Sequence, residues 1–283
     1  MKVEERLSQK KKAVDRELEL ILPEEDSPLF QAMRYAVLSG GKRFRPLLAL
    51  SSGECFGVSQ DVLLPFACAL ELIHNYSLIH DDLPSMDNDD FRRGKPSCHK
   101  AFGEDIALLA GAALLTLAFE VLVRAPVSAN LQPQKEQLII EIGHLAGVRG
   151  MIGGQLMDIT LSPEELTEET MHELILKKTG ALIVASVKTG GLLGKAGNSE
   201  FKAIVQYGRN IGLAFQIRDD ILDSEGEERR EKNLSPNYVS LFGNEVSEQR
   251  LKSFVGIARS ALEETSLESE ELHYLASKLL EWP

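Results

Sequence analysis

Hydrophobic positions along the chain follow a helical period for most of its length. Apolar residues recur every three or four positions, as they do along the buried face of an α-helix. This spacing predicts helices over residues 62–79, 108–123, 138–152, 174–193, 203–222 and 251–262. Apolar–polar alternation bounded by Asn-Gly or Asp-Gly turns, the signal of a β-hairpin, is nearly absent. The pattern therefore predicts an all-α protein.

Glycine, proline and capping residues indicate where these helices begin and end. Residues 39–41, SGG, are expected to end an early helix, and Ala125 and Pro126 are expected to stop the helix before them. Residues 162–165, SPEE, are typical of a helix start with proline in the first turn. Because no shift in composition marks a boundary and no long repeat is present, we expect a single domain over residues 1–283.

The segment 106–123, IALLAGAALLTLAFEVLV, is apolar on nearly all sides. Its length is near the lower limit for a membrane span. Glu120 lies within it, however, and alanine and glycine supply much of its apolar character. We therefore expect a helix buried inside a bundle, and no transmembrane segment.

Composition restricts the class of ligand. The 283 residues carry a formal net charge of −12, which argues against nucleic-acid binding and against attraction to an anionic membrane. An anionic ligand would require a local reversal of the field, which metal ions provide. The three cysteines show no paired spacing, and the charged start MKVEERLSQKKK lacks the apolar core of a signal peptide. We therefore expect a cytoplasmic protein.

Two acidic clusters interrupt the apolar pattern. The first places five aspartates in the ten residues 81–90, and three basic residues follow at once in FRRGKP. Asp81 and Asp87 are six apart, which would set them on opposing faces of an unbroken helix, so we expect a kink around Pro84 that brings them together. Solvated surfaces intersperse the two signs of charge. The separation of signs indicates a ligand that carries both a cation and an anion.

The second acidic cluster lies in FQIRDDILD, residues 215–223. Asp219 and Asp223 are four apart, which sets both carboxylates on one helix face. Like charges at this spacing destabilise a helix that lacks a counter-ion. Oxygen ligands without His or Cys at metal-binding spacing favour magnesium, which binds through a few carboxylates together with substrate phosphates.

A glycine turn supplies further positive charge. Residues 40–46, GGKRFRP, carry three cations and precede an apolar run. Neither the spacing nor a preceding strand fits a Walker phosphate loop. We interpret the turn as a second anion pocket that works without metal.

Together these motifs resemble those of the trans-prenyltransferases, the head-to-tail isoprenyl diphosphate synthases, and above all the bacterial farnesyl and related geranylgeranyl enzymes. The resemblance covers residues 35–243 and rests on five motifs in the family's order, which are GGKRFRP, DDLPSMD with RRGKP, GGQLMD at 153–158, KKTG at 177–180 and FQIRDDILD. It implies the isoprenoid synthase fold, a bundle of about ten mostly antiparallel helices around a deep central cavity.

The resemblance also implies a role for each matching residue. About three magnesium ions would be held against the allylic diphosphate by Asp81, Asp87 and Asp219, supported by Asp82, Asp220 and Asp223. The allylic substrate would be contacted by Arg92, Lys178, Thr179 and Gln216, with Lys178 also counted as catalytic. The diphosphate of isopentenyl diphosphate would be bound by Lys42, Arg45, His74 and Arg93. Gln155 and Asp158 would line the cavity near the metals.

The implied reaction is the condensation of isopentenyl diphosphate with dimethylallyl or geranyl diphosphate after magnesium-assisted ionisation. Tyr76 and Ser77 precede Asp81 by about one helical turn and point down the same face, where they would form the floor that sets chain length. This arrangement resembles the farnesyl type. Geranylgeranyl diphosphate is the alternative product, and Tyr76 is otherwise an ordinary core residue.

Two departures from the family leave other roles open. The loop after the second motif, residues 224–237, is short, and Ser235 falls where a lysine is expected, with Lys232 as a substitute. The C-terminal sequence LLEWP also lacks the basic tail that often helps to close the site in the family. A non-catalytic partner subunit would lack one aspartate motif, whereas both are intact. A terpene cyclase would not need GGKRFRP for a second diphosphate. The family also implies a homodimer.

Overall fold

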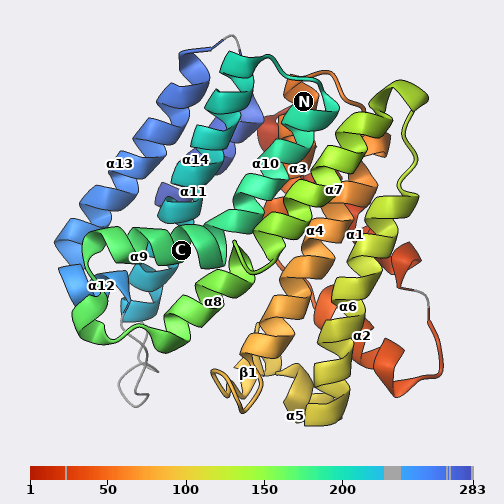
Figure 1. Ribbon diagram of the computed structural model, residues 1–283, viewed down its shortest axis with the longest axis vertical. Helices are drawn as coiled ribbons and strands as arrows, with labels where there is room; N and C mark the ends of the chain where they lie inside the picture. The colour runs from red at the N-terminus through yellow and green to blue at the C-terminus, as the bar shows by residue number, and fades with distance from the viewer. Residues whose placement is uncertain (23, 226–236, 266, 268, 282–283) are drawn as a thin grey trace. The chain divides into compact units, whose positions relative to one another are not determined.

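The computed structural model describes residues 1–22, 24–225, 237–265, 267 and 269–281. The prediction of an all-α protein is confirmed, because helices dominate the described chain and a single two-stranded hairpin is the sheet within it (Figure 1). The chain divides into two compact units, one comprising residues 1–50 and 58–132 and the other residues 51–57 and 133–283. We call these unit 1 and unit 2. The prediction of a single domain stays a prediction.

Unit 1 contains the first aspartate-rich segment. Its helices are α1 Val3–Ile21, α2 Pro28–Leu38, the start of α3 Phe44–Cys55, α4 Gln60–Asp81, α5 Cys98–Phe102, α6 Glu104–Arg124 and the 3₁₀ turn Ala129–Leu131. Its strands are β1 Phe91–Arg92 and β2 Lys95–Pro96. The predicted helix ends at residues 39–41 and at Ala125 are confirmed.

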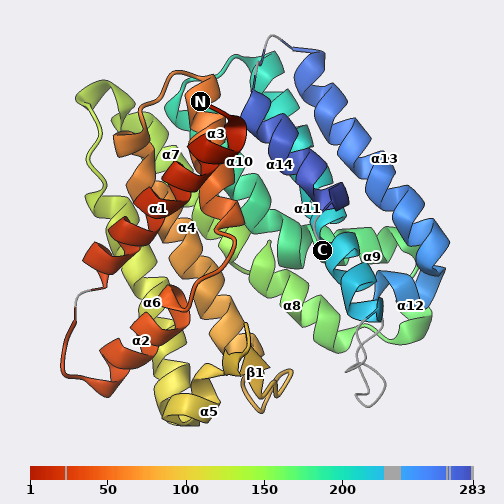
Figure 2. The same ribbon diagram turned by 180° about the vertical axis from the view of Figure 1, so that it is seen from behind.

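Helices α4 and α6 lie side by side and antiparallel within unit 1 (Figures 1 and 2). Gly111 of α6 makes their close approach possible, because a Cβ there would collide with the imidazole of His80 on α4. His80 Nε2 also lies 3.1 Å from the carbonyl oxygen of Leu108. The end of α4 that carries the aspartates is therefore fixed against α6.

The prediction that the segment 106–123 is buried on all sides is wrong. Helix α6 buries one face through small and apolar residues such as Ala110 and Leu114. Its opposite face is open and carries apolar side chains, with exposed fractions of 52% for Leu108, 55% for Leu109 and 62% for Val123, beside the exposed Thr116 and Glu120. An apolar sequence pattern cannot distinguish a core helix from one that keeps an apolar surface.

Unit 2 contains the second aspartate motif. Its elements are α7 Gln132–Ala146, α8 Met151–Thr160, the 3₁₀ turn Pro163–Glu165, α9 Glu168–Ile175, the π-helix Leu176–Gly180, α10 Ala181–Leu193, α11 Asn198–Glu225, α12 Tyr238–Phe242, α13 Asn244–Glu263 and α14 Glu270–Glu281. Helix α11 packs against both α10 and α13 (Figure 2). A Cβ on Gly212 of α11 would lie 2.7 Å from the Cα of Gly180, so two glycines permit the close approach of α11 to the π-helix Leu176–Gly180.

Three predicted helix boundaries in unit 2 need correction. The segment 138–152 is not one helix, because a turn over residues 147–150 separates α7 from α8. The segment 174–193 contains the π-helix Leu176–Gly180, which separates α9 from α10. Residues 162–165 form a capped 3₁₀ turn, and the α-helix begins only at Glu168. Glycine-rich turns and single π turns leave little trace in apolar periodicity.

Candidate active site

The first aspartate-rich segment begins where α4 ends. Helix α4 runs to Asp81, and Pro84 follows in a series of turns. The backbone N–H of Asp87 donates to the carbonyl oxygen of Asp81 at 2.9 Å. The predicted kink is therefore confirmed, since it returns Asp87 to Asp81 although six positions separate them.

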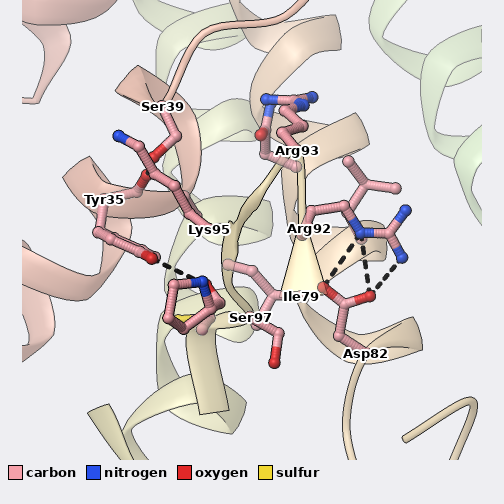
Figure 3. A pocket seen from close by; sticks show the side chains of 13 residues that line it. Tyr35, Ser39, Ile79, Asp82, Arg92, Arg93, Lys95 and Ser97 are labelled. Atoms are coloured by element: carbon pink, nitrogen blue, oxygen red, sulfur yellow. Dashed lines mark hydrogen bonds and ion pairs between the residues drawn. The ribbon is translucent and has the colours of Figure 1, made fainter. Parts of the chain in front are cut away.

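The side chain of Asp82, the residue after Asp81, is paired with Arg92. Its side chain is buried, with 2% of the residue exposed, and accepts hydrogen bonds from Arg92 Nε at 3.1 and 3.2 Å and from Arg92 Nη2 (Figure 3). Burial raises the pKa of the Asp82 carboxyl, although Arg92 acts in the opposite direction. The structure thus places Asp82 as the carboxylate that holds Arg92.

Arg92 and Arg93 are presented by a β-hairpin that the sequence did not predict. Strands β1 and β2 are joined by Arg93 and Gly94, whose φ angles are 54° and 73°. Two successive positive φ values are typical of a type I′ hairpin turn. Tyr35 Oη donates to the carbonyl oxygen of Pro96 at 2.8 Å and anchors the hairpin to α2 (Figure 3).

The hairpin brings Arg93 to the turn formed by GGKRFRP. Arg93 Nη1 donates to the carbonyl oxygen of Gly40. Gly41 has φ of 132°, and a Cβ there would lie 3.1 Å from the Cζ of Arg93. Glycine therefore suits this position both for its backbone conformation and for its lack of a side chain. Two motifs that are about 50 residues apart in the sequence therefore meet.

Arg43, one of the three cations of this turn, has a structural role. It is 2% exposed and donates to Asp15, to Glu71 and to the carbonyl oxygen of Val37, each at 2.8 Å. Its guanidinium is thereby committed inside unit 1, which leaves Lys42 and Arg45 of the same turn as the candidate diphosphate ligands.

His74 lies among these cations. Its pKa is held well below the usual value, first by burial and then by Arg45, Arg93 and Arg92. Guanidinium groups that disfavour a second positive charge create a field that attracts an anion. Arg45, Arg92 and Arg93, which are predicted to bind the two diphosphates, therefore lie near enough to His74 to disfavour its protonation.

A small pocket opens between the hairpin and helices α2 and α4. Figure 3 shows Tyr35, Ser39, Ile79, Asp82, Arg92 and Arg93 around it. Its walls combine an apolar side with guanidinium groups. This mixture suits a ligand with a charged head and an apolar part.

Tyr76 lies one turn before Asp81 on α4. It is 6% exposed, and its ring meets that of His80 edge-on at 5.5 Å between centroids. Burial and then the charge of Asp81 raise the pKa of Tyr76 to about 12. Ser77 Oγ donates to the carbonyl oxygen of His74 at 2.9 Å. The role of Tyr76 and Ser77 as a floor stays a prediction.

In unit 2, a chain of hydrogen bonds connects three predicted site residues. Thr179 Oγ1 donates to Gln216 Oε1 at 2.6 Å, and Gln216 Nε2 donates to Asp220 Oδ1 at 3.0 Å. Asp220 is 5% exposed and also accepts from the backbone N–H of Tyr238 at 2.8 Å. Asp219 is half-buried and Asp223 is exposed one turn further along α11.

Lys178 is oriented by an ion pair with Asp158 of the GGQLMD motif. A Cβ on Gly154 of that motif would collide with the backbone N of Lys178 and lie 2.6 Å from its Cα. This glycine therefore lets α8 pack directly on the π-helix Leu176–Gly180. Sequence reasoning assigned the GGQLMD motif only to the cavity, whereas the structure shows that Gly154 of this motif is needed for helix packing.

The two aspartate motifs belong to different units. Within the described ranges, no group of three or more His, Cys, Asp or Glu side chains lies close enough to hold a metal ion. Ser235 and Lys232, named for the short loop, lie outside the described residues. Sequence reasoning missed Tyr238, whose partners are far from it along the chain.

Helices α4 and α6 are long and apolar enough to cross a membrane by length and composition. A core helix of a soluble protein passes the same test, and most of α4 is buried. The absence of a transmembrane segment stays a prediction.

Comparisons with known proteins agree with the motifs. A family model described as polyprenyl synthetase matches residues 26–236. A farnesyl diphosphate synthase of Geobacillus stearothermophilus is 39% identical over 290 residues, which cover 97% of this chain and 96% of that protein. A geranylgeranyl diphosphate synthase of Cyanophora paradoxa is 41% identical over 245 residues, which cover 83% of this chain and 81% of that protein.

Among solved structures, an FPP/GFPP synthase from Zymomonas mobilis superposes with a TM-score of 0.89 at 35% identity. The match covers 98% of each chain. Similarity of this extent applies to the fold as a whole and not to isolated motifs.

Proposed function

The chain belongs to the polyprenyl synthetase family, and we propose that it is a trans-prenyltransferase that makes farnesyl diphosphate. The proposed reaction condenses isopentenyl diphosphate, head to tail, with dimethylallyl or geranyl diphosphate. The observation that carries the proposal is the pocket beside the first aspartate motif, which Asp82, Arg92 and Arg93 line and where Arg93 bonds to the GGKRFRP turn. Guanidinium groups in this density suit a diphosphate better than any neutral ligand.

The carboxylates fit magnesium. Asp81, Asp87, Asp219 and Asp223 offer oxygen ligands, and Mg²⁺ is usually held through one or two carboxylates plus substrate phosphates, so a complete protein cage is not required. We propose Asp81, Asp87 and Asp219 as the ligands of about three ions, with Asp223 in support. Bound magnesium would neutralise charge on the leaving diphosphate.

The residues of the chain would bind and orient the two substrates. Lys42, Arg45 and Arg93 would hold isopentenyl diphosphate, and a neutral His74 would donate one hydrogen bond without adding charge. Arg92, held by Asp82, and Lys178, held by Asp158, would contact the allylic diphosphate in fixed orientations. Their positive charges would stabilise the developing leaving group.

The chain length of the product is proposed to depend on Tyr76. Its buried ring one turn before Asp81 supports this role. Geranylgeranyl diphosphate is the second candidate product, favoured by the geranylgeranyl synthase among the relatives.

We further propose a cytoplasmic homodimer. The apolar face of α6, with Leu108, Leu109 and Val123 exposed, supports a contact with a second copy, because exposed apolar patches on monomers are usually covered. Equilibrium sedimentation of the purified protein tests this part, and a monomer at micromolar concentration would contradict it.

The experiment for the function is a product assay. Purified protein is incubated with magnesium, labelled isopentenyl diphosphate and, in separate reactions, dimethylallyl, geranyl or farnesyl diphosphate, and products are sized after dephosphorylation. We expect a C15 product from the two shorter starters, and longer products from Tyr76→Ala. A C20 product from the wild type would refute the role of Tyr76, and no condensation with any starter would favour a non-catalytic partner subunit.

A further inference from the structure

Tyr238, the first residue of α12, binds the second aspartate motif through its backbone. Its N–H donates to Asp220 Oδ2 at 2.8 Å, across 18 positions of sequence. Asp220 in turn accepts from Gln216, and Gln216 accepts from Thr179. One backbone amide therefore completes a chain of hydrogen bonds that orients three residues proposed for the allylic site.

The side chain of Tyr238 is held on its other side. The tyrosine is 0% exposed, and its hydroxyl donates to Glu168 Oε1 at 2.9 Å. Its ring stacks on that of His172 with an interplanar angle of 7° and 5.7 Å between centroids. Burial, and then the bond to Glu168, raise the pKa of Tyr238 well above its usual value, so the hydroxyl stays protonated and can donate.

Glu168 is itself fixed at the start of α9. Arg250 Nε of α13 lies 2.6 Å from Glu168 Oε1, and Arg250 Nη2 donates to Glu168 Oε2 at 3.1 Å. This pairing lowers the pKa of Glu168 against the effect of desolvation, so an ionised acceptor faces the tyrosine hydroxyl. Helices α9 and α13 therefore clamp Tyr238, and Tyr238 clamps Asp220.

We propose that Tyr238 is a positioning residue of the second aspartate motif, which acts through Asp220 and is anchored by Glu168. The inference rests on the proposed function, since it assigns a purpose to the orientation of Asp220, Gln216 and Thr179. Nothing in the aspartate motif itself requires a tyrosine 18 residues later, so the assignment comes from the contacts alone.

The alternative is that Tyr238 is only a core residue, and the chain offers a matched control. Tyr207 is also 0% exposed, and its hydroxyl donates to the carbonyl oxygen of Leu272 at 2.7 Å. Replacement by phenylalanine removes this one hydrogen bond from Tyr207. From Tyr238 it removes the bond to Glu168 and also the contact of 3.1 Å with His172 Nε2. The hydrogen bond of Tyr207 connects α11 to α14 and does not involve the aspartates of the second motif.

The test compares Tyr238→Phe with Tyr207→Phe. Calorimetry measures binding of geranyl thiodiphosphate, an unreactive allylic analogue, over a range of magnesium concentrations, and thermal melting measures stability. We expect both variants to melt at lowered temperatures. Only Tyr238→Phe should need about five- to tenfold more magnesium for half-maximal binding, because it alone loses the hydrogen bonding that anchors the residue bound to Asp220. Equal magnesium requirements in the two variants would overturn the inference.

A second pair keeps the test decisive if Tyr238→Phe fails to fold. Glu168→Gln retains an oxygen that can accept from the tyrosine hydroxyl, whereas Glu168→Ala does not. We expect Glu168→Gln to bind the analogue within about twofold of wild type and Glu168→Ala to show the raised magnesium requirement. Equal binding by both variants would contradict the role of Glu168 as the residue that anchors Tyr238. A wild type that binds no analogue with magnesium would instead refute the proposed function.

Discussion

Replacement of Gly154 by alanine should loosen the contact that orients Lys178. The new Cβ would lie 2.6 Å from the Cα of Lys178 and 2.7 Å from the carbonyl carbon of Lys177, whereas ordinary contact begins at 3.4 Å. The backbone N of Lys178 would lie closer still, so helix α8 or the π-helix must move by more than about 0.8 Å, and these obstacles are backbone atoms that cannot rotate away. Lys178, whose backbone forms this contact, also makes the ion pair with Asp158, so the movement should disturb that pair.

Overpacking of this kind costs about 1–3 kcal/mol of unfolding free energy. For a protein of this size, that corresponds to a fall of roughly 2–10 °C in melting temperature. The displaced Lys178 should also raise KM for the allylic diphosphate more than KM for isopentenyl diphosphate.

Differential scanning calorimetry and initial rates measure the two effects. Gly256→Ala is the matched control, because no atom lies within 4 Å of a Cβ at Gly256, in the middle of α13. There the change should stabilise by about 0.4–1 kcal/mol. A Gly154→Ala variant that melts at or above the wild-type temperature would refute the reasoning.

Three further predictions concern unit 1. Arg43→Ala should lower the free energy of unfolding in urea by about 3–5 kcal/mol, because Glu71, which is 2% exposed, loses its cationic partner. The double variant Arg43→Ala with Glu71→Gln should recover part of that free energy. An unchanged urea midpoint in Arg43→Ala would contradict this prediction. The pKa of His74 lies well below its usual value, so the unfolded chain binds a proton that the folded protein excludes, and stability should fall as pH drops below about 6.5. His74→Gln should flatten that dependence, and a curve parallel to wild type would refute it. Gly111→Ala should destabilise by about 1–3 kcal/mol through collision with His80, and wild-type melting would count against this contact.

The helical architecture could be predicted because its cause is local. Apolar spacing alone predicts α4, α11 and α13, and proline chemistry predicts the kink that returns Asp87 to Asp81. The meeting of Arg93 with the GGKRFRP turn was implied only by the family resemblance, whereas charge alone indicated a second anion pocket.

Features that depend on distant partners could not be predicted. The hairpin turn at Arg93 and Gly94 uses a non-glycine residue at positive φ, which the usual Asn-Gly signal does not cover. The bond from Tyr238 to Glu168 spans 70 positions and leaves no periodic trace. The apolar residues on the open face of α6 are of the same types as those on its buried face, and the packing of α4, α2 and α5 decides which side is covered.

The central claim is that magnesium, the aspartate motifs and the basic cluster act together on an allylic diphosphate. The most direct measurement is condensation of labelled isopentenyl diphosphate with geranyl diphosphate by the wild-type protein, in magnesium and in excess EDTA. The account predicts a C15 product in magnesium and none in EDTA. Product formation in EDTA, or its absence in magnesium, would contradict it.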